Sequence, residues 1–149
     1  MITTIQTNSG NADFQQLVRL LDQDLATRDG ADNAFYAQFN KIDLIQHAIV
    51  AYEGDVPVGC GAIKAFSPEA MEVKRMYVLP EKRGMGIASV VLAALEEWAK
   101  QLGYKKTVLE TGKRQPEAIA LYTHRGYVVT PNYGQYVGVD NSVCFEKPL

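Results

Sequence analysis

The chain has 149 residues, of which 47% are hydrophobic and 21% charged, and its formal net charge is -2. This length and balance predict one globular domain over residues 1–149 and argue against disorder. Basic residues are scattered apart from short pairs, so no broad basic surface indicates nucleic-acid binding. The opening MITTIQTNSG lacks a signal-peptide pattern, and no apolar run approaches the roughly 18 residues of a membrane span. We therefore expect a cytoplasmic protein that binds neither nucleic acid nor membrane.

The first half of the chain predicts a strand, a helix and a hairpin. Residues 2–7 are typical of an edge strand, and residues 12–25 place apolar side chains on one helical face behind a cap at Asn11. Residues 31–45 are ambiguous and could form a short helix. Residues 47–66 predict a β-hairpin with EGDVP at its turn.

The second half alternates strands and helices. Strands are expected at 72–80, 105–112, 127–131 and 142–149, and helices at 87–103 and 115–126. Pro80 closes the first of these strands, Gly103 ends the first helix, and Pro116 lies in the first turn of the second. The order predicts an α/β (α+β) protein with a mixed sheet and helices on its faces.

The two cysteines, Cys60 and Cys144, lie far apart, with neither metal-ligand spacing nor a CxxC pair. Such residues are most often buried thiols of a protein in a reducing compartment. We therefore expect no metal site.

The stretch KRGMGIASVV, residues 82–91, places two glycines between a strand and a helix. Glycines there allow a tight turn or let a ligand approach the main chain, and a helix N-terminus attracts phosphate. A Walker loop would need Gly-Lys-Ser/Thr, which is absent, and a dinucleotide-binding turn would need a third glycine where the chain has Ser89. A purely structural turn is the remaining alternative.

Two motifs resemble the signatures of the GNAT family of N-acetyltransferases. Arg83, Gly86 and Ala88 match the family's Arg/Gln-x-x-Gly-x-Gly/Ala loop, which follows a strand. Downstream, QPEAIALYTHRGY resembles the second signature through Ala118, Leu121, Tyr122, Gly126 and Tyr127. The sequence departs from the family at Gln115, where many members carry Asn.

The resemblance implies the GNAT fold and acetyl-CoA as cosubstrate. The fold is a mixed, mostly antiparallel sheet of about seven strands with helices on both faces, in which strands 72–80 and 105–112 splay apart. We expect a bulge near Arg75 or Met76, because strict alternation cannot place Val73, Met76 and Val78 on one face. The expected coenzyme-binding residues are Met76, Tyr77, Val78, Arg83, Gly84, Met85, Gly86, Ile87, Ala88, Ser89, Gln115 and Tyr122.

Acyl transfer to an amine needs a base for the ammonium proton, a donor to the developing oxyanion and an acid for the departing thiolate. The resemblance implies Tyr122 as the acid and the Val78 N–H as the oxyanion donor. Glu110 resembles the base of ribosomal-protein N-terminal acetyltransferases, and Glu72 resembles the base of the histone-acetylating branch. Either could act directly or through a water, and Glu110 is slightly favoured.

The acceptor is expected to be a primary amine of a small molecule or peptide, with a small polar amine favoured. Its pocket is expected to be walled by Phe35, Tyr36, Asp43, Tyr133 and Tyr136. Family members are often dimers, so a homodimer is also consistent with the resemblance. The alternative function is a non-catalytic, regulatory acyl-CoA-binding module that acts through a protein partner.

Overall fold

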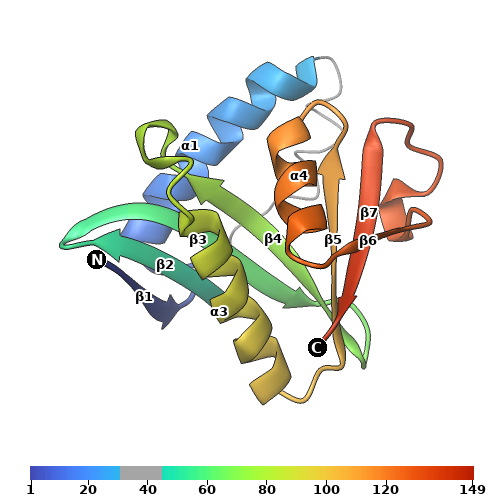
Figure 1. The fold of residues 1–149 in the computed structure, drawn as a ribbon, viewed down its shortest axis with the longest axis horizontal. Coiled ribbons are helices and arrows are strands. Elements are labelled where there is room, and N and C mark those ends of the chain that lie inside the picture. Colours follow the sequence, from blue (N-terminus) through green and yellow to red (C-terminus); the bar gives the residue numbers. More distant parts are fainter. Residues whose placement is uncertain (31–44) are drawn as a thin grey trace.

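The computed structural model describes residues 1–30 and 45–149. Its elements follow the expected order, and the ambiguous segment 31–45 lies outside the described residues apart from Ile45. The strands are β1 (Ile2–Thr7), β2 (His47–Glu53), β3 (Val56–Ala65), β4 (Ala70–Val78), β5 (Lys106–Gly112), β6 (Val128–Thr130) and β7 (Ser142–Pro148). The helices are α1 (Ala12–Asp29), α3 (Ile87–Gln101) and α4 (Pro116–His124), with short 3-10 helices at Pro80–Lys82 and Gly134–Tyr136 (Figure 1).

The strands form one seven-stranded sheet in the order β1-β2-β3-β4-β5-β7-β6. Its neighbouring strands are antiparallel except β4 and β5, which are parallel. The expected mixed, mostly antiparallel sheet is therefore confirmed. Among the described helices, none is long and apolar enough to cross a membrane.

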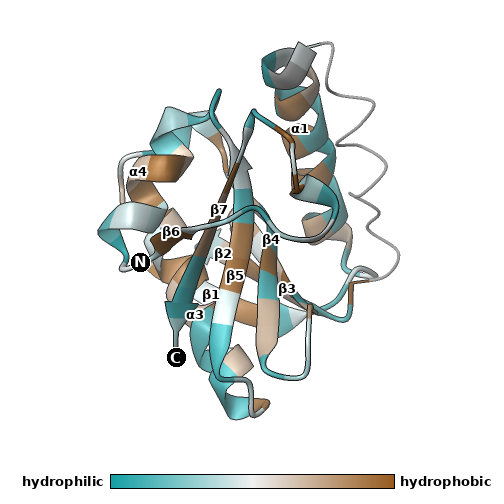
Figure 2. Ribbon diagram, turned by 90° about the vertical axis from the view of Figure 1, so that its right-hand side faces the viewer, coloured by the Kyte–Doolittle hydropathy of each residue, from teal (hydrophilic) through white to brown (hydrophobic). Residues whose placement is uncertain are grey.

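Each face of the sheet carries its own apolar layer, because side chains alternate along the strands. On β2, Ala48 and Val50 pack with α1, whereas Ile49 and Ala51 belong to the cluster built around α3 and Tyr122 of α4. The central strands are accordingly apolar along much of their length (Figure 2). The Asn11 side chain caps α1 as expected, accepting a hydrogen bond from the Phe14 N–H at 2.9 Å.

The parallel strands β4 and β5 separate soon after they meet. Their ladder contains only the pairs Ala70↔Lys106, Met71↔Thr107 and Glu72↔Val108. Because β4 continues to Val78 and β5 to Gly112, the second half of β4 has no partner strand on that side within the described residues (Figure 1). The expected splay is confirmed.

A β-bulge lies in the same half of β4. Cys60 pairs with Tyr77 and Ala62 with Lys74, so Arg75 and Met76 together face the single residue Gly61. Arg75 has a φ of 61°, a conformation that costs a non-glycine residue about 1–2 kcal/mol. The bulge expected near Arg75 or Met76 is therefore confirmed.

Gly61 leaves the space that the bulge needs, and we expect Gly61→Ala to destabilise the fold by about 1–3 kcal/mol. A Cβ at this position would lie 2.5 Å from Met76 Sδ, 2.8 Å from Leu95 Cδ1 and 2.9 Å from Val91 Cγ1. Urea denaturation would measure the loss, with the exposed Gly10→Ala as control. Equal midpoints for both variants would contradict this packing.

Candidate active site

The gap between β4 and β5 opens into a groove of about 440 Å³. The groove is lined by α1, the second half of β4, the loop before α3, and α4. Every residue expected to bind the coenzyme lines this groove except Met85, which is 58% exposed. The structure therefore brings together Met76, Tyr77, Val78, Arg83, Gly84, Gly86, Ile87, Ala88, Ser89, Gln115 and Tyr122.

The edge of β4 offers its backbone to the gap. The Leu79 N–H donates to the Val58 carbonyl of β3 at 3.0 Å, so the backbone of the preceding Val78 faces the opposite side. The Val78 carbonyl accepts a hydrogen bond from Arg83 Nε at 2.9 Å, which agrees with that direction. An extended ligand in the gap could therefore pair with Val78 as an added strand would.

The two loop glycines create the turn that exposes the start of α3. Gly84 and Gly86 have φ of 80° and 81°, and a Cβ at either would meet no atom within 4 Å. Glycine is therefore favoured at these positions by the positive φ angle and not by a lack of space for a side chain. The first hydrogen bond of α3 runs from the Val90 N–H to the Gly86 carbonyl, so the amides of 87–89 precede the helical ladder. They lie at the positive end of the helix dipole and could bind a pyrophosphate.

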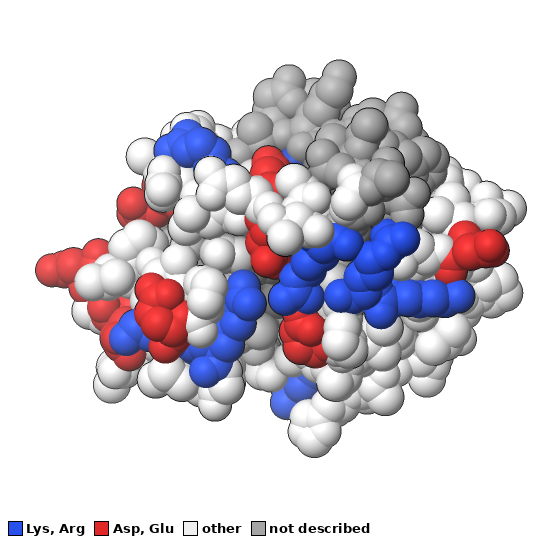
Figure 3. Space-filling view, turned by 90° about the horizontal axis from the view of Figure 1, so that it is seen from above, with Lys and Arg blue, Asp and Glu red and all other residues white. Residues whose placement is uncertain are grey.

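Cationic side chains flank the groove. Arg28, Lys82 and Arg83 line it, and the Arg83 guanidinium lies over the Tyr77 ring with Cζ 5.4 Å from the centroid. Lys and Arg side chains gather, with acidic groups among them, on the end of the molecule that carries the glycine loop and the start of α4 (Figure 3). Arg28 is paired with Asp24 and Glu117, and Lys82 with Glu53, so Arg83 is the cation of the three without an ion pair among the described residues. Its charge favours an anionic ligand at the glycine loop.

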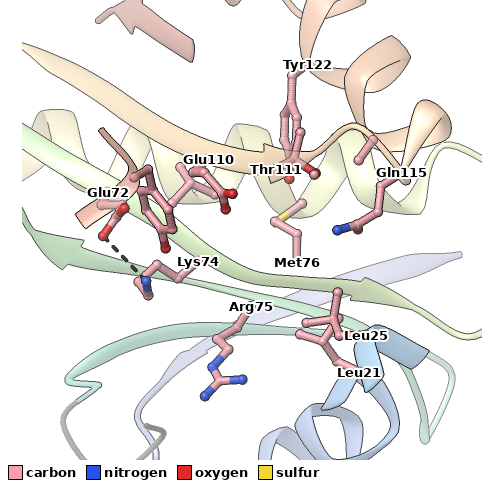
Figure 4. Close-up of a pocket in the computed structure, with 14 residues that line it drawn as sticks. Leu21, Leu25, Glu72, Lys74, Arg75, Met76, Glu110, Thr111, Gln115 and Tyr122 are labelled. Atoms are coloured by element: carbon pink, nitrogen blue, oxygen red, sulfur yellow. Dashed lines mark ion pairs between the residues drawn. The ribbon is translucent and has the colours of Figure 1, made fainter. Parts of the chain in front are cut away.

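A smaller chamber of about 120 Å³ adjoins the groove along β4 (Figure 4). Both cavities are lined by Met76, Gln115 and Tyr122, so a molecule in the groove and one in the chamber could meet there. The Gln115 side chain does not cap α4. Six further residues line the chamber but not the groove: Glu72, Lys74, Arg75, Glu110, Thr111 and Tyr136.

Tyr122 stands where the two cavities meet. It is 6% exposed, and its ring packs against Tyr127 and Phe145 at centroid distances of 5.7 and 6.1 Å. Burial and, to a lesser degree, the charge of Glu110 raise the pKa of the Tyr122 phenol well above its usual range. The hydroxyl therefore stays protonated at neutral pH and can donate a hydrogen bond.

The two candidate bases differ in their surroundings. Glu72 is 8% exposed; its Oε2 accepts a hydrogen bond from the Tyr133 hydroxyl at 2.7 Å, and its Oε1 lies 3.5 Å from Lys74 Nζ (Figure 4). Each Glu72 oxygen thus already has one partner, and its remaining lone pairs could still accept a proton. Glu110 projects from β5 into the chamber, and its charge acts on Tyr122. Both carboxylates line the chamber.

The expected acceptor residues are placed only in part. Tyr136 lines the chamber. The ring of Tyr133 packs edge-on against the ring of Tyr136, with the centroids 5.9 Å apart, and the Tyr133 hydroxyl donates a hydrogen bond to Glu72. Phe35, Tyr36 and Asp43 lie outside the described residues. Arg75 also lines the chamber, and no sequence motif marks it. Within the described residues, no three His, Cys, Asp or Glu side chains gather in a way that could hold a metal ion.

The fold and the sequence of this chain match those of known acyltransferases. The chain superimposes over its whole length on a Klebsiella pneumoniae protein described as an acyl-CoA N-acyltransferase, with a TM-score of 0.84, 33% identity and 98% of that chain covered. The model of the acetyltransferase (GNAT) family matches residues 14–127. The chain therefore belongs to the GNAT family of acetyltransferases.

Proteins of similar sequence are also described as acetyltransferases. An IAA acetyltransferase of Azospirillum brasilense is 38% identical over 102 residues, which cover 68% of this chain and 67% of that protein. The uncharacterized N-acetyltransferase YjgM of Escherichia coli is 40% identical over 53% of this chain and 48% of its own length, so the match spans about half of that relative. An acetyltransferase from Elizabethkingia anophelis with acetyl-CoA bound shares the fold, with a TM-score of 0.70 at 19% identity over 99% of this chain and 98% of that one.

Proposed function

We propose that this protein is an N-acetyltransferase that moves the acetyl group of acetyl-CoA directly to a primary amine of a small molecule or peptide. The observation that carries the proposal is the meeting of groove and chamber at Tyr122. One cavity has the backbone and charges for a coenzyme, and the other has carboxylates for an ammonium group. Direct transfer needs two such sites in contact.

The groove fits acetyl-CoA in chemical type. The edge of β4 at Met76–Val78 offers backbone groups for the amides of the pantetheine arm, with the Val78 carbonyl already accepting from Arg83 Nε. The amides of 84–89 with Arg83 offer donors for the pyrophosphate. When bound, acetyl-CoA supplies an activated thioester for attack. The family membership and the acetyl-CoA seen in a structural neighbour support this assignment.

In the proposed reaction, three groups of the chain act as base, oxyanion donor and acid. Glu110 takes the ammonium proton of the acceptor, directly or through a water, and Glu72 is the alternative base. The Val78 N–H donates to the acyl oxygen as negative charge develops on it. The buried Tyr122 hydroxyl donates to the departing sulfur.

We expect both acetyl-CoA and CoA, but not ATP, to raise the melting temperature of the protein. A ligand that binds only the folded state at about 100 times its Kd adds about 2.7 kcal/mol of stability. A thermal-shift titration with the three ligands side by side measures this. No shift at saturating acetyl-CoA would overturn the coenzyme assignment and the catalytic roles that rest on it.

Turnover is tested by following CoA release over a panel of amino acids, amino-acid amides, polyamines and short peptides. Release that depends on a primary amine supports the proposed reaction. Binding of acetyl-CoA without release for any amine would favour the regulatory alternative.

A further inference from the structure

An ion pair joins two helices that line the coenzyme groove. Arg28, in the last turn of α1, pairs with Glu117, in the first turn of α4, and the two residues lie 89 positions apart in the chain. The end of α1 and the start of α4 accordingly lie side by side (Figure 1). Both side chains line the groove, so this pair is made of groups that a ligand in the groove would meet.

The Glu117 carboxylate lies where the groove favours a negative charge. Burial raises the pKa of this carboxyl, but its own backbone N–H and the charges of Arg28 and Arg83 outweigh burial and lower the pKa overall. Arg28 belongs to α1, whereas Arg83 belongs to the loop before α3. Two cations from different walls of the groove therefore act on one carboxylate.

A phosphate group is the same kind of partner for these arginines. Guanidinium groups bind phosphates and carboxylates through the same charge-assisted hydrogen bonds. Arg28 donates to Glu117 from Nη1, while its Nε lies 3.2 Å from Asp24 Oδ2 within α1. Asp24 thus holds the guanidinium in place from one side, and the Nη1 side is the one at which partners can be exchanged.

The exchange costs little because the pair is partly exposed. The Glu117 side chain is 53% exposed and that of Arg28 is 24% exposed. Ion pairs that water reaches contribute little net stability. A carboxylate in the first turn of a helix is also stabilised by the helix dipole, so Glu117 keeps a favourable position after it leaves Arg28.

We propose that Arg28 is a further coenzyme-binding residue, and that a phosphate group of the coenzyme replaces the Glu117 carboxylate at its Nη1. The inference rests on the proposed function, which places acetyl-CoA in this groove. In the free protein, Glu117 keeps Arg28 paired. In the complex, Arg28 and Arg83 bind the phosphates from two walls of the groove. Glu117 is therefore an internal competitor that weakens coenzyme binding.

Glu117→Gln tests the competition. We expect the Kd for CoA to fall by about two- to fivefold, the equivalent of one exposed ion pair, because the competing charge is gone. Calorimetric titration of CoA measures the change. A pair that only braces the two helices would leave the Kd unchanged or raise it, and either result would overturn the inference.

Glu69→Gln is the matched control for this titration. Glu69 is also an exposed carboxylate in an ion pair, 66% exposed and 3.8 Å from Lys105 Nζ, but it lines neither cavity. We expect its variant to keep the native Kd for CoA. A Kd that falls as much in Glu69→Gln as in Glu117→Gln would reflect net charge alone and would contradict a local competition.

Arg28→Gln, added to Glu117→Gln, shows whether Arg28 itself binds the coenzyme. In that background the Glu117 carboxylate is absent, so its repulsion cannot account for a change. We expect the Kd for CoA to rise by about threefold or more relative to Glu117→Gln alone, because a charge-assisted contact is lost. Equal values in the single and double variants would mean that Arg28 makes no contact with the coenzyme.

Failure of this inference can be told apart from failure of the proposed function. If CoA binds neither the native protein nor Glu117→Gln, the coenzyme assignment fails. Titration of inorganic pyrophosphate then decides separately whether Arg28 binds phosphate. Pyrophosphate binding to Glu117→Gln that disappears in the double variant would support Arg28 as a phosphate-binding residue, and no detectable binding would overturn it.

Discussion

Replacing Tyr122 with Phe is expected to lower kcat for acetyl transfer by about 100-fold or more, with little change in the affinity for acetyl-CoA. The phenylalanine ring keeps the contacts with Tyr127 and Phe145, so the walls of the groove remain. The hydroxyl that we propose as the donor to the departing sulfur is lost. Steady-state kinetics of CoA release and calorimetric titration of acetyl-CoA measure the two quantities.

Tyr127→Phe is the matched control for this variant. The Tyr127 ring belongs to the same aromatic cluster, but its hydroxyl bonds to Thr107 at 2.7 Å and Glu96 at 2.9 Å and lines neither cavity. We expect this control to lose about 1 kcal/mol of stability and to keep its kcat. Equal losses of kcat in both variants would mean that Tyr122 acts through packing and not as an acid.

The environment of Tyr122 also limits how it can act. Because burial raises its pKa well above the usual value, complete transfer of its proton to a thiolate is more unfavourable than it would be for an exposed tyrosine. A short hydrogen bond to the sulfur as charge develops needs no complete transfer. In the proposed reaction, Tyr122 therefore contributes most as a donor that stabilises the leaving group while the C–S bond breaks.

The order of the elements could be predicted because it depends on local patterns. Apolar side chains at helical spacing mark α1 and α3, and Gly103 ends α3. The bulge was also predictable, since the apolar residues of β4 break strict alternation at that point. The coenzyme groove could be predicted because most of its residues belong to one short motif. Once the strand before this motif and the helix after it are predicted, the position of the motif in space is largely determined.

The chamber could not be predicted in the same detail because its contacts join distant parts of the chain. Tyr133 reaches Glu72 across 61 positions, and Arg75 reaches Asp22 across 53. The first contact depends on how the segment between β6 and β7 returns over the sheet, and the second on the direction in which the bulge turns Arg75. Neither the path of the β6–β7 segment nor the orientation of the Arg75 side chain can be predicted from the neighbouring residues in the sequence. Cytoplasmic location and dimerisation stay predictions.

Glu110→Gln is expected to lower kcat at neutral pH by about 100- to 10,000-fold, the range for loss of a general base. Glu72→Gln should lower it much less in the proposed reaction, because Glu72 then only shapes the chamber through its contacts with Tyr133 and Lys74. Glutamine is close in size to glutamate in both variants, so chamber volume changes little. Measurement of kcat for both variants with the same saturating amine compares the two carboxylates directly.

The pH dependence distinguishes a lost base from a damaged site. As pH rises, more of the acceptor amine is already deprotonated, so a base is needed less. The deficit of Glu110→Gln relative to the native protein should therefore shrink toward high pH, whereas a misplaced acceptor would leave a constant deficit. A larger loss in Glu72→Gln, with a deficit that shrinks in the same way, would make Glu72 the base. Small losses in both variants would mean that a water accepts the ammonium proton without help from either carboxylate. Glu110, which lies near Tyr122, would then serve acceptor binding alone.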